Sequence, residues 1–222
     1  MKYKRYILIL YCMCIFMQLN YEKNQGMNMS FSDMLVNISG CFSCLFLHIP
    51  FYGALVIDSH SNDLNPLRVI MHRSSLHVVR NQQKRSIILA ILMIVIALMS
   101  MIAFALTNGC SIHVSVDLAL KFVLCFLIRF YIWANIILLS KWVLNSFACG
   151  LLINLVMGFF DVISRGLPTE IKIDFISRIF SVDSELWSTG RLIGKISIFT
   201  AIIAVMIIIY MYIAQKREFI DE

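Results

Sequence analysis

The chain has 222 residues, of which 60% are hydrophobic and only 14% are charged, and its formal net charge is +6. So few charged residues leave too little polar surface to coat a water-soluble globule of this length. A charge of +6 would favour nucleic-acid binding in a soluble protein. Here the placement of the basic residues between apolar runs is more informative than their sum, and we predict no nucleic-acid partner.

Six apolar runs predict an all-α polytopic membrane protein that forms one transmembrane domain over residues 1–222. A helix needs about 20 apolar residues to cross hydrocarbon, and the uncharged run from Ile87 to Leu106 meets that length. Backbone amides cannot stay unpaired in hydrocarbon, and continuous apolar runs favour helices over the alternating pattern of a barrel. The six predicted spans are Tyr6–Leu19, Met34–Ile57, Ile87–Leu106, Leu118–Leu139, Phe147–Ile163 and Leu192–Ile213.

The first run, Tyr6–Leu19, is the shortest and has a second interpretation. A basic start followed by a short apolar stretch also describes a signal peptide. The next residues, Asn20–Gln25, are polar and bulky and contain no small-x-small processing site. Because cleavage would also leave five spans with the termini on opposite faces, we expect an uncleaved anchor.

The basic residues between the runs predict the orientation. With the N-terminus inside, eleven Lys and Arg residues fall in inner segments and five in outer segments, and four of those five lie in one long loop that carries less topological weight. The inner ones are Lys2, Lys4, Arg5, Arg68, Arg73, Arg80, Lys84, Arg85, Lys141, Lys216 and Arg217. We therefore predict a multi-pass protein of the cell membrane with both termini in the cytoplasm.

Two connecting segments are long enough for structure of their own. In the inner loop, residues 58–86, Asn65 can cap a helix and Pro66 suits its first position. The apolar face of that predicted helix comprises Leu67, Ile70, Met71, Ser74 and Val78. The outer segment, residues 164–191, mixes apolar and charged side chains, which favours half-buried helical pieces near the outer interface.

Three ionisable residues lie inside predicted spans, where charge is costly enough to make each a candidate site. Lys121 and Asp161 lie near the outer ends of adjacent spans, so an ion pair between them and snorkelling of Lys121 are both open. Arg129 lies near the middle of its span. It either lines a polar cavity or is buried against carbonyls and a partner subunit.

Recognisable catalytic and metal motifs are missing from the sequence. The pair Cys41 and Cys44 forms a CxxC without a second thiol or histidine pair, and His48 is isolated near Pro50, so we predict neither a metal site nor catalytic residues. The segment Gly190–Ser197 has three residues between its glycines where a phosphate-binding loop has four. We therefore expect no enzyme and no cofactor bound by this chain.

Taken together, the six spans, the basic inner loop, the short inner turn Ser140–Ser146 and the amphipathic outer segment resemble small permease subunits of the ABC-2 family of ATP-binding-cassette transporters. The approach to the third span, residues 72–84, also resembles that of Gram-positive peptide and bacteriocin exporters. The resemblance implies a coupling helix that docks on the ATPase, formed by Pro66, Leu67, Arg68, Ile70, Met71, Arg73 and Ser74. It implies short outer re-entrant helices over 167–187, with Pro168, Phe175, Phe180 and Trp187 as candidate residues.

The expected function is therefore that of a dimeric membrane subunit of an ATP-driven exporter of an amphipathic or hydrophobic substrate, such as a peptide, toxin or lipid-like compound. The expected partners are a cytoplasmic ABC ATPase that binds the ATP, a second permease chain, identical or paralogous, and membrane lipid. One alternative is a non-transporting immunity or sensor protein that sequesters a peptide or partner. Another is an ion- or proton-coupled carrier, which ranks lower because inverted repeats with broken helices are not evident. For the predicted inner helix, docking on an ATPase and lying on anionic lipid both remain open.

Overall fold

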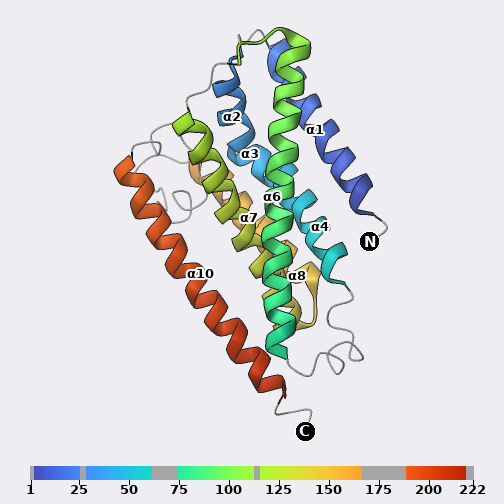
Figure 1. Cartoon of the computed structure of the whole chain (residues 1–222), viewed down its shortest axis with the longest axis vertical. Coiled ribbons are helices and arrows are strands. Elements are labelled where there is room, and N and C mark those ends of the chain that lie inside the picture. The colour runs from blue at the N-terminus through green and yellow to red at the C-terminus, as the bar shows by residue number, and fades with distance from the viewer. Residues whose placement is uncertain (1–2, 26–28, 62–74, 113–115, 167–188, 219–222) are drawn as a thin grey trace.

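The computed structural model describes residues 3–25, 29–61, 75–112, 116–166 and 189–218, and every regular element within these ranges is a helix (Figure 1). The predicted all-α class is therefore confirmed. The elements in chain order are α1 (Lys4–Asn24), α2 (Phe31–Ser39), α3 (Cys41–Ser43), the π-helical turn η1 (Cys44–His48), α4 (Ile49–His60), α6 (Ser75–Asn108), α7 (Val116–Leu144), α8 (Phe147–Gly166) and α10 (Thr189–Glu218).

Three helical segments of the described residues are long and apolar enough to cross a membrane: Cys41–His60, His77–Asn108 and Val116–Leu144. Two shorter apolar helices are Phe147–Ile163 and Thr200–Ile213. These lengths support a helical membrane protein. Membrane crossing by the other predicted spans, and the orientation of the termini, stay predictions.

Consecutive long helices run in opposite directions along the bundle (Figure 1). At one end, here called the Phe31 end, the Phe31 amide donates to the Ser111 carbonyl at 3.1 Å. At the opposite end, the Trp142 end, Trp142 and Tyr210 both donate to the side chain of Gln82. The start of α6 and the ends of α7 and α10 therefore meet at the Trp142 end, as the predicted alternation requires of these three helices.

The first helix, α1, lies beside only the C-terminal half of α6. Ser100 Oγ donates to Cys12 Sγ at 3.1 Å, and the rings of Phe16 and Phe104 lie 5.9 Å apart. The start of α1 therefore lies about halfway along the bundle rather than at the Trp142 end (Figure 1). The described part of α1 thus does not by itself place the N-terminus on the same side as the C-terminus.

Two helix boundaries differ from the sequence-based expectation. The predicted span Met34–Ile57 is broken at Gly40, whose backbone is extended (φ −60°, ψ 160°). Residues Ser75–Ser86, predicted as part of the inner loop, are the first turns of α6. Their buried face, which includes Val78, packs within the bundle and extends the third span without interruption.

Aromatic side chains fill the centre of the bundle between α1, α4 and α7. Tyr11, Tyr52, Phe122, Phe126 and Phe130 are each at most 1% exposed. The rings of Tyr52 and Phe130 lie 4.6 Å apart, within the range of favourable aromatic pairs. The interior of a single chain is therefore packed with large side chains at this level.

Helices α7 and α8 are joined by a short turn, in which Asn145 has a positive φ of 53°, and they approach closely at Gly150. A Cβ at Gly150 would lie 2.5 Å from Ile137 Cα and 2.9 Å from the Ile136 carbonyl oxygen. Both atoms belong to the backbone of α7, so neither can move without moving the helix. The missing side chain of Gly150 thus sets the distance between these two helices.

We predict that Gly150→Ala destabilises the protein by about 1–3 kcal/mol, because overpacking forces α7 and α8 apart. The matched control is Gly194→Ala in α10, where an added Cβ meets nothing within 4 Å. That change should be neutral or stabilising, since alanine favours a helix over glycine by about 1 kcal/mol. Unfolding of both variants in mixed detergent micelles, followed by tryptophan fluorescence, checks the difference. Equal midpoints for the two variants would contradict the close approach.

Candidate functional site

The strongest concentration of buried polar contacts surrounds the break at Gly40. Helix α2 begins with a capping box, in which Ser30 Oγ accepts from the Asp33 amide at 3.2 Å and the Asp33 carboxylate accepts from the Ser30 amide at 2.9 Å. Ser30 Oγ also donates to the Asp33 carboxylate at 2.6 Å, and this bond, more than the bond from the Ser30 amide, lowers the pKa of the Asp33 carboxyl. The helix then ends at Ser39 because the extended backbone of Gly40 cannot continue it.

A helix end leaves four backbone carbonyls without helical partners, and in an apolar interior each is costly. At the end of α2 every one of these four carbonyls accepts a hydrogen bond from a side chain. The acceptors and donors are Val36 from Ser39 Oγ at 2.8 Å, Asn37 from Ser43 Oγ at 2.8 Å, Ile38 from His48 Nε2 at 2.8 Å and Ser39 from Arg129 Nη1 at 3.4 Å. Side chains from four elements therefore take over the role that a further helical turn would have had.

Arg129 reaches this break from the middle of α7 and is only 4% exposed. Its guanidinium contacts the Ser39 carbonyl and Cys44 Sγ, and it lies 5.5 Å from the ring centroid of Phe126 and 6.0 Å from that of Trp133. The positive charge is placed where the dipole of α2 is negative, which is favourable. Of the two interpretations left open for Arg129, the described contacts match burial against a carbonyl.

His48 links the break to α1. Its Nε2 bonds the Ile38 carbonyl, which can only accept, so Nε2 carries a proton. Its Nδ1 lies 2.8 Å from the hydroxyl of Tyr11, and the rings of Phe126 and Phe130 pack edge-on against the imidazole. A neutral imidazole satisfies both contacts, and His48 acts as a connector between α1 and the end of α2.

The π-helical turn η1 places these groups. Pro50 has no amide hydrogen, so the helix cannot keep its regular bonding pattern just before it. The turn Cys44–His48 widens there, and π-turns inside helices occur frequently at functional sites. The break itself lies ten residues before Pro50, at Gly40, and the sequence analysis did not predict it.

The other two candidate charges lie nearer the Phe31 end. Lys121 and Asp161 are 8% and 2% exposed, as expected for intramembrane residues. The ion pair described for Lys121 is to Asp117, one helical turn away, at 2.5 Å. Antiparallel packing sets Asn154 on α8 opposite Trp133 on α7, with Asn154 Nδ2 donating to the Trp133 carbonyl at 3.1 Å.

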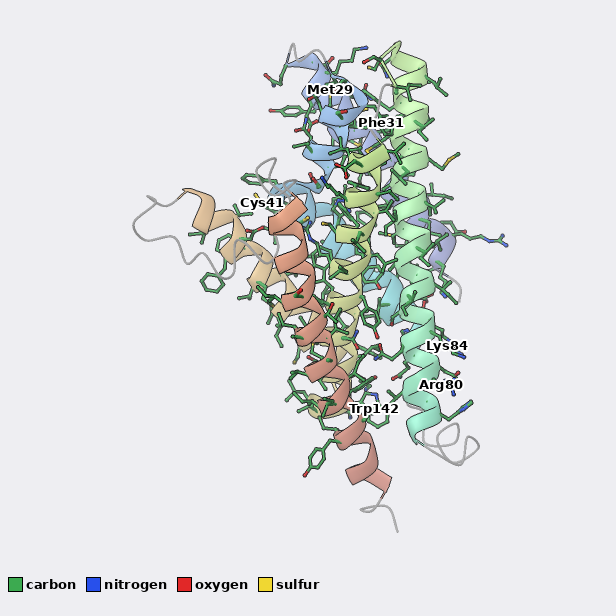
Figure 2. The ribbon with its side chains drawn as sticks, turned by 60° about the vertical axis from the view of Figure 1, so that its left-hand side comes forward. Met29, Phe31, Cys41, Arg80, Lys84 and Trp142 are labelled. Atoms are coloured by element: carbon green, nitrogen blue, oxygen red, sulfur yellow. The ribbon has the colours of Figure 1, made fainter. Side chains whose placement is uncertain are left out.

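A second polar cluster joins three helices at the Trp142 end, and the sequence did not single it out. Gln82 is fully buried, and its Oε1 accepts from Trp142 Nε1 at 3.2 Å and from the hydroxyl of Tyr210. The rings of Trp142 and Tyr210 meet edge to face at 5.8 Å. Trp142 lies between the helices while nearby Arg80 and Lys84 point outward (Figure 2). A Gln, a Trp and a Tyr on separate helices carry no sequence signal, because only the fold brings them together.

Beside this cluster lies a smaller one on α6 and α7. Gln83 Nε2 donates to Asn135 Oδ1 at 2.7 Å, and the hydroxyl of Tyr131 donates to Gln83 Oε1. The hydroxyl of Tyr52 on α4 donates to the Ser86 carbonyl at 3.1 Å. Polar side chains thus join α4, α6, α7 and α10 near one level of the bundle.

The remaining predicted sites lie outside the described residues. These are the coupling-helix residues from Pro66 to Ser74 and the outer residues Pro168, Phe175, Phe180 and Trp187. The CxxC thiols Cys41 and Cys44 are buried and form no disulfide, and no group of three metal-ligating side chains occurs within the described ranges. Comparison with protein-family models, with curated proteins and with solved structures finds no match.

We predict that Arg129→Met destabilises the protein by about 1–3 kcal/mol, because it leaves the Ser39 carbonyl with a weaker partner in an apolar setting. The same change should lower the rate at which a maleimide labels Cys44, since Arg129 donates to that sulfur and a neighbouring cation favours the reactive thiolate. Leu120→Met, at a position that is 64% exposed on the same helix, is the control and should change neither quantity. Unchanged stability together with unchanged labelling of Cys44 would show that Arg129 does not hold the end of α2.

We also predict that Tyr210→Phe costs about 0.5–1.5 kcal/mol, because it removes one hydrogen bond to a buried Gln82 oxygen. Tyr212 is 64% exposed on the same helix, so Tyr212→Phe is the matched control and should be neutral within a few tenths of a kcal/mol. Detergent unfolding measures both. A red shift of Trp142 emission is expected for Tyr210→Phe alone. Equal behaviour of the two variants would show that the cluster does not stabilise the packing of α10.

Proposed function

We propose that this chain is the membrane subunit of an ATP-driven exporter of the ABC-2 type, with the Trp142 end in the cytoplasm. The proposal rests on the resemblance described above and is supported by the three helical segments that are long and apolar enough to cross a membrane. In this orientation the segment 62–74, the α7–α8 turn and the C-terminus face the cytoplasm, and the segment 167–188 faces outward.

The observation that carries the proposal is the continuity of α6. This helix runs without a break for 34 residues, about 51 Å at 1.5 Å per residue. It begins directly after the segment proposed to dock on an ATPase, and it packs against α1, α4, α7 and α10. A partner that moves the start of α6 would therefore move a rigid rod through the whole bundle, rather than bend a flexible loop.

The energy source would be a separate chain. Cyclic movement of a solute needs a source of free energy, and the segment Gly190–Ser197 lacks the spacing and the hydroxyl residue of a phosphate-binding loop. We therefore assign ATP binding and hydrolysis to a cytoplasmic ABC ATPase and no catalytic residue to this chain. Arginines of the docking helix, Arg68 and Arg73, would pair with acidic residues of that ATPase.

The route for the substrate would form between two permease chains. The aromatic core between α1, α4 and α7 leaves the centre of one chain filled, whereas α8 exposes a broad apolar surface. Its exposed members include Leu152, Val156, Phe159 and Phe160, each at least 44% accessible. A surface of this kind suits an amphipathic or hydrophobic cargo such as a peptide, toxin or lipid-like compound better than an ion or sugar.

The same filled core also favours the alternative function, a non-transporting immunity or sensor protein that sequesters a peptide or partner in the bilayer. Such a protein needs an apolar surface but neither an ATPase nor a moving helix. The carrier alternative is weaker, because the described contacts of Arg129 are those of a group that holds a helix end. The two leading proposals differ in whether function depends on an ATPase.

We predict that the chain, purified from its native membrane in mild detergent, brings an ATPase with it, and that Ile70→Glu combined with Arg73→Glu abolishes that association. The substitutions place negative charge on both the apolar and the basic side of the proposed docking helix. Lys23→Glu, at the Phe31 end, is the control and should retain the ATPase. Identification and quantification by mass spectrometry checks the result.

Retention of the ATPase by the double variant would contradict the docking assignment. Full physiological function in cells that lack any associated ATPase would instead support the immunity alternative.

A further inference from the structure

One exposed stripe of α6 changes from basic to apolar along its length. Arg80 and Lys84 are exposed near the start of the helix, and the same side then carries only apolar side chains. The apolar members are Ile88, Ile91, Val95, Met99 and Leu106, with exposures of 63%, 46%, 49%, 61% and 67%. At 3.6 residues per turn, all these positions fall within an arc of about 100°. The opposite side of α6, which includes Gln82 and Ser86, is buried in the bundle.

The level of Gln82 matches a membrane–water interface. Trp142 and Tyr210, amphipathic aromatics of the kind enriched at interfaces, both bond Gln82, and Tyr212 is exposed close by. From Gln82 to Leu106 the helix rises about 36 Å, between the ~30 Å of a hydrocarbon core and the ~40–45 Å of a full bilayer. Arg80 and Lys84 flank Gln82 by two residues on either side, so their charges lie in the headgroup layer.

Neither basic side chain has an ion-pair partner among the described residues, and both point away from the other helices (Figure 2). Lys84 lies about 6 Å along the axis from Ile88, one helical turn, so a molecule bound to the cations would continue directly along the apolar stripe. A phosphate-bearing headgroup with attached acyl chains has this sequence of charge and apolarity. A soluble protein bound to Arg80 and Lys84 would meet lipid-facing apolar side chains one helical turn away, so it fits this position less well than a lipid does.

We propose that Arg80 and Lys84 form a binding site for an anionic phospholipid, whose phosphate pairs with the two cations and whose acyl chains lie along Ile88, Ile91 and Val95. The site rests only on the placement of α6 in a membrane and not on ATP-driven export. It holds the start of α6 at the membrane interface nearest the Trp142 end.

The test uses the purified full-length protein, without any ATPase, in bilayers that contain phosphatidylglycerol and phosphatidylcholine. Electron paramagnetic resonance of spin-labelled lipids measures how strongly each lipid associates with the protein. The wild type should prefer phosphatidylglycerol, and Arg80→Gln combined with Lys84→Gln should weaken that preference by about fivefold for each lost charge. Arg80→Lys combined with Lys84→Arg keeps both charges and should keep the preference, and Lys23→Gln should alter it less than twofold.

Helical circular dichroism and Trp142 emission establish that each variant is folded, which is expected because both side chains are exposed. An unchanged phosphatidylglycerol preference in the folded double Gln variant would overturn the proposal. Displacement of the labelled lipid by inorganic phosphate at matched ionic strength would also overturn it, since that result describes a site for a soluble anion.

Discussion

The constraint on which much of this structure depends is the need to satisfy the backbone at the end of α2. A helix that stops inside an apolar bundle exposes four carbonyls, and no water is at hand to bond them. Here Ser39, Ser43, His48 and Arg129 supply the donors. Because those residues belong to α2, α3, η1 and α7, the hydrogen bonds that satisfy the four carbonyls also fix the relative positions of these elements. His48 extends the same network to Tyr11 on α1.

This network accounts for a charge that would otherwise be costly. A buried arginine inside a membrane span is tolerated when carbonyls and dipoles stabilise it. Arg129 meets the Ser39 carbonyl, the negative end of α2 and the faces of Phe126 and Trp133. The contact between Arg129 and the end of α2 therefore lowers both the cost of burying the guanidinium and the cost of ending the helix. A polar residue at mid-span in this protein therefore holds the fold together.

The sequence predicted the helices well because the apolar runs that specify them are local signals. All six runs are helical, and the positions of α7 and α8 agree with the prediction within a few residues. The break at Gly40 was missed because a glycine in an apolar run is compatible with either a continuous or an interrupted helix. The cluster of Gln82, Trp142 and Tyr210 was missed for a different reason. Trp142 and Tyr210 lie 60 and 128 residues after Gln82 in the sequence, and none of the three stands out alone. Burial of Arg129, Lys121 and Asp161 followed from the spans, but their partners depend on helix register, which composition does not specify.

Helix α6 is held near its start by two kinds of contact that act over different distances. Its first third is tied on one side to α7 and α10 through Gln82, and on the other side Arg80 and Lys84 point away from the bundle. Hydrogen bonds to a buried amide are short-ranged and break with small displacements, whereas attraction between exposed cations and an anionic surface persists over several ångströms. A force applied at the start of α6 would therefore release the Gln82 contacts before it pulled the helix from the lipid surface. The rod would then pivot about the side that carries Arg80 and Lys84, so that a displacement at the start of α6 is carried into the bundle.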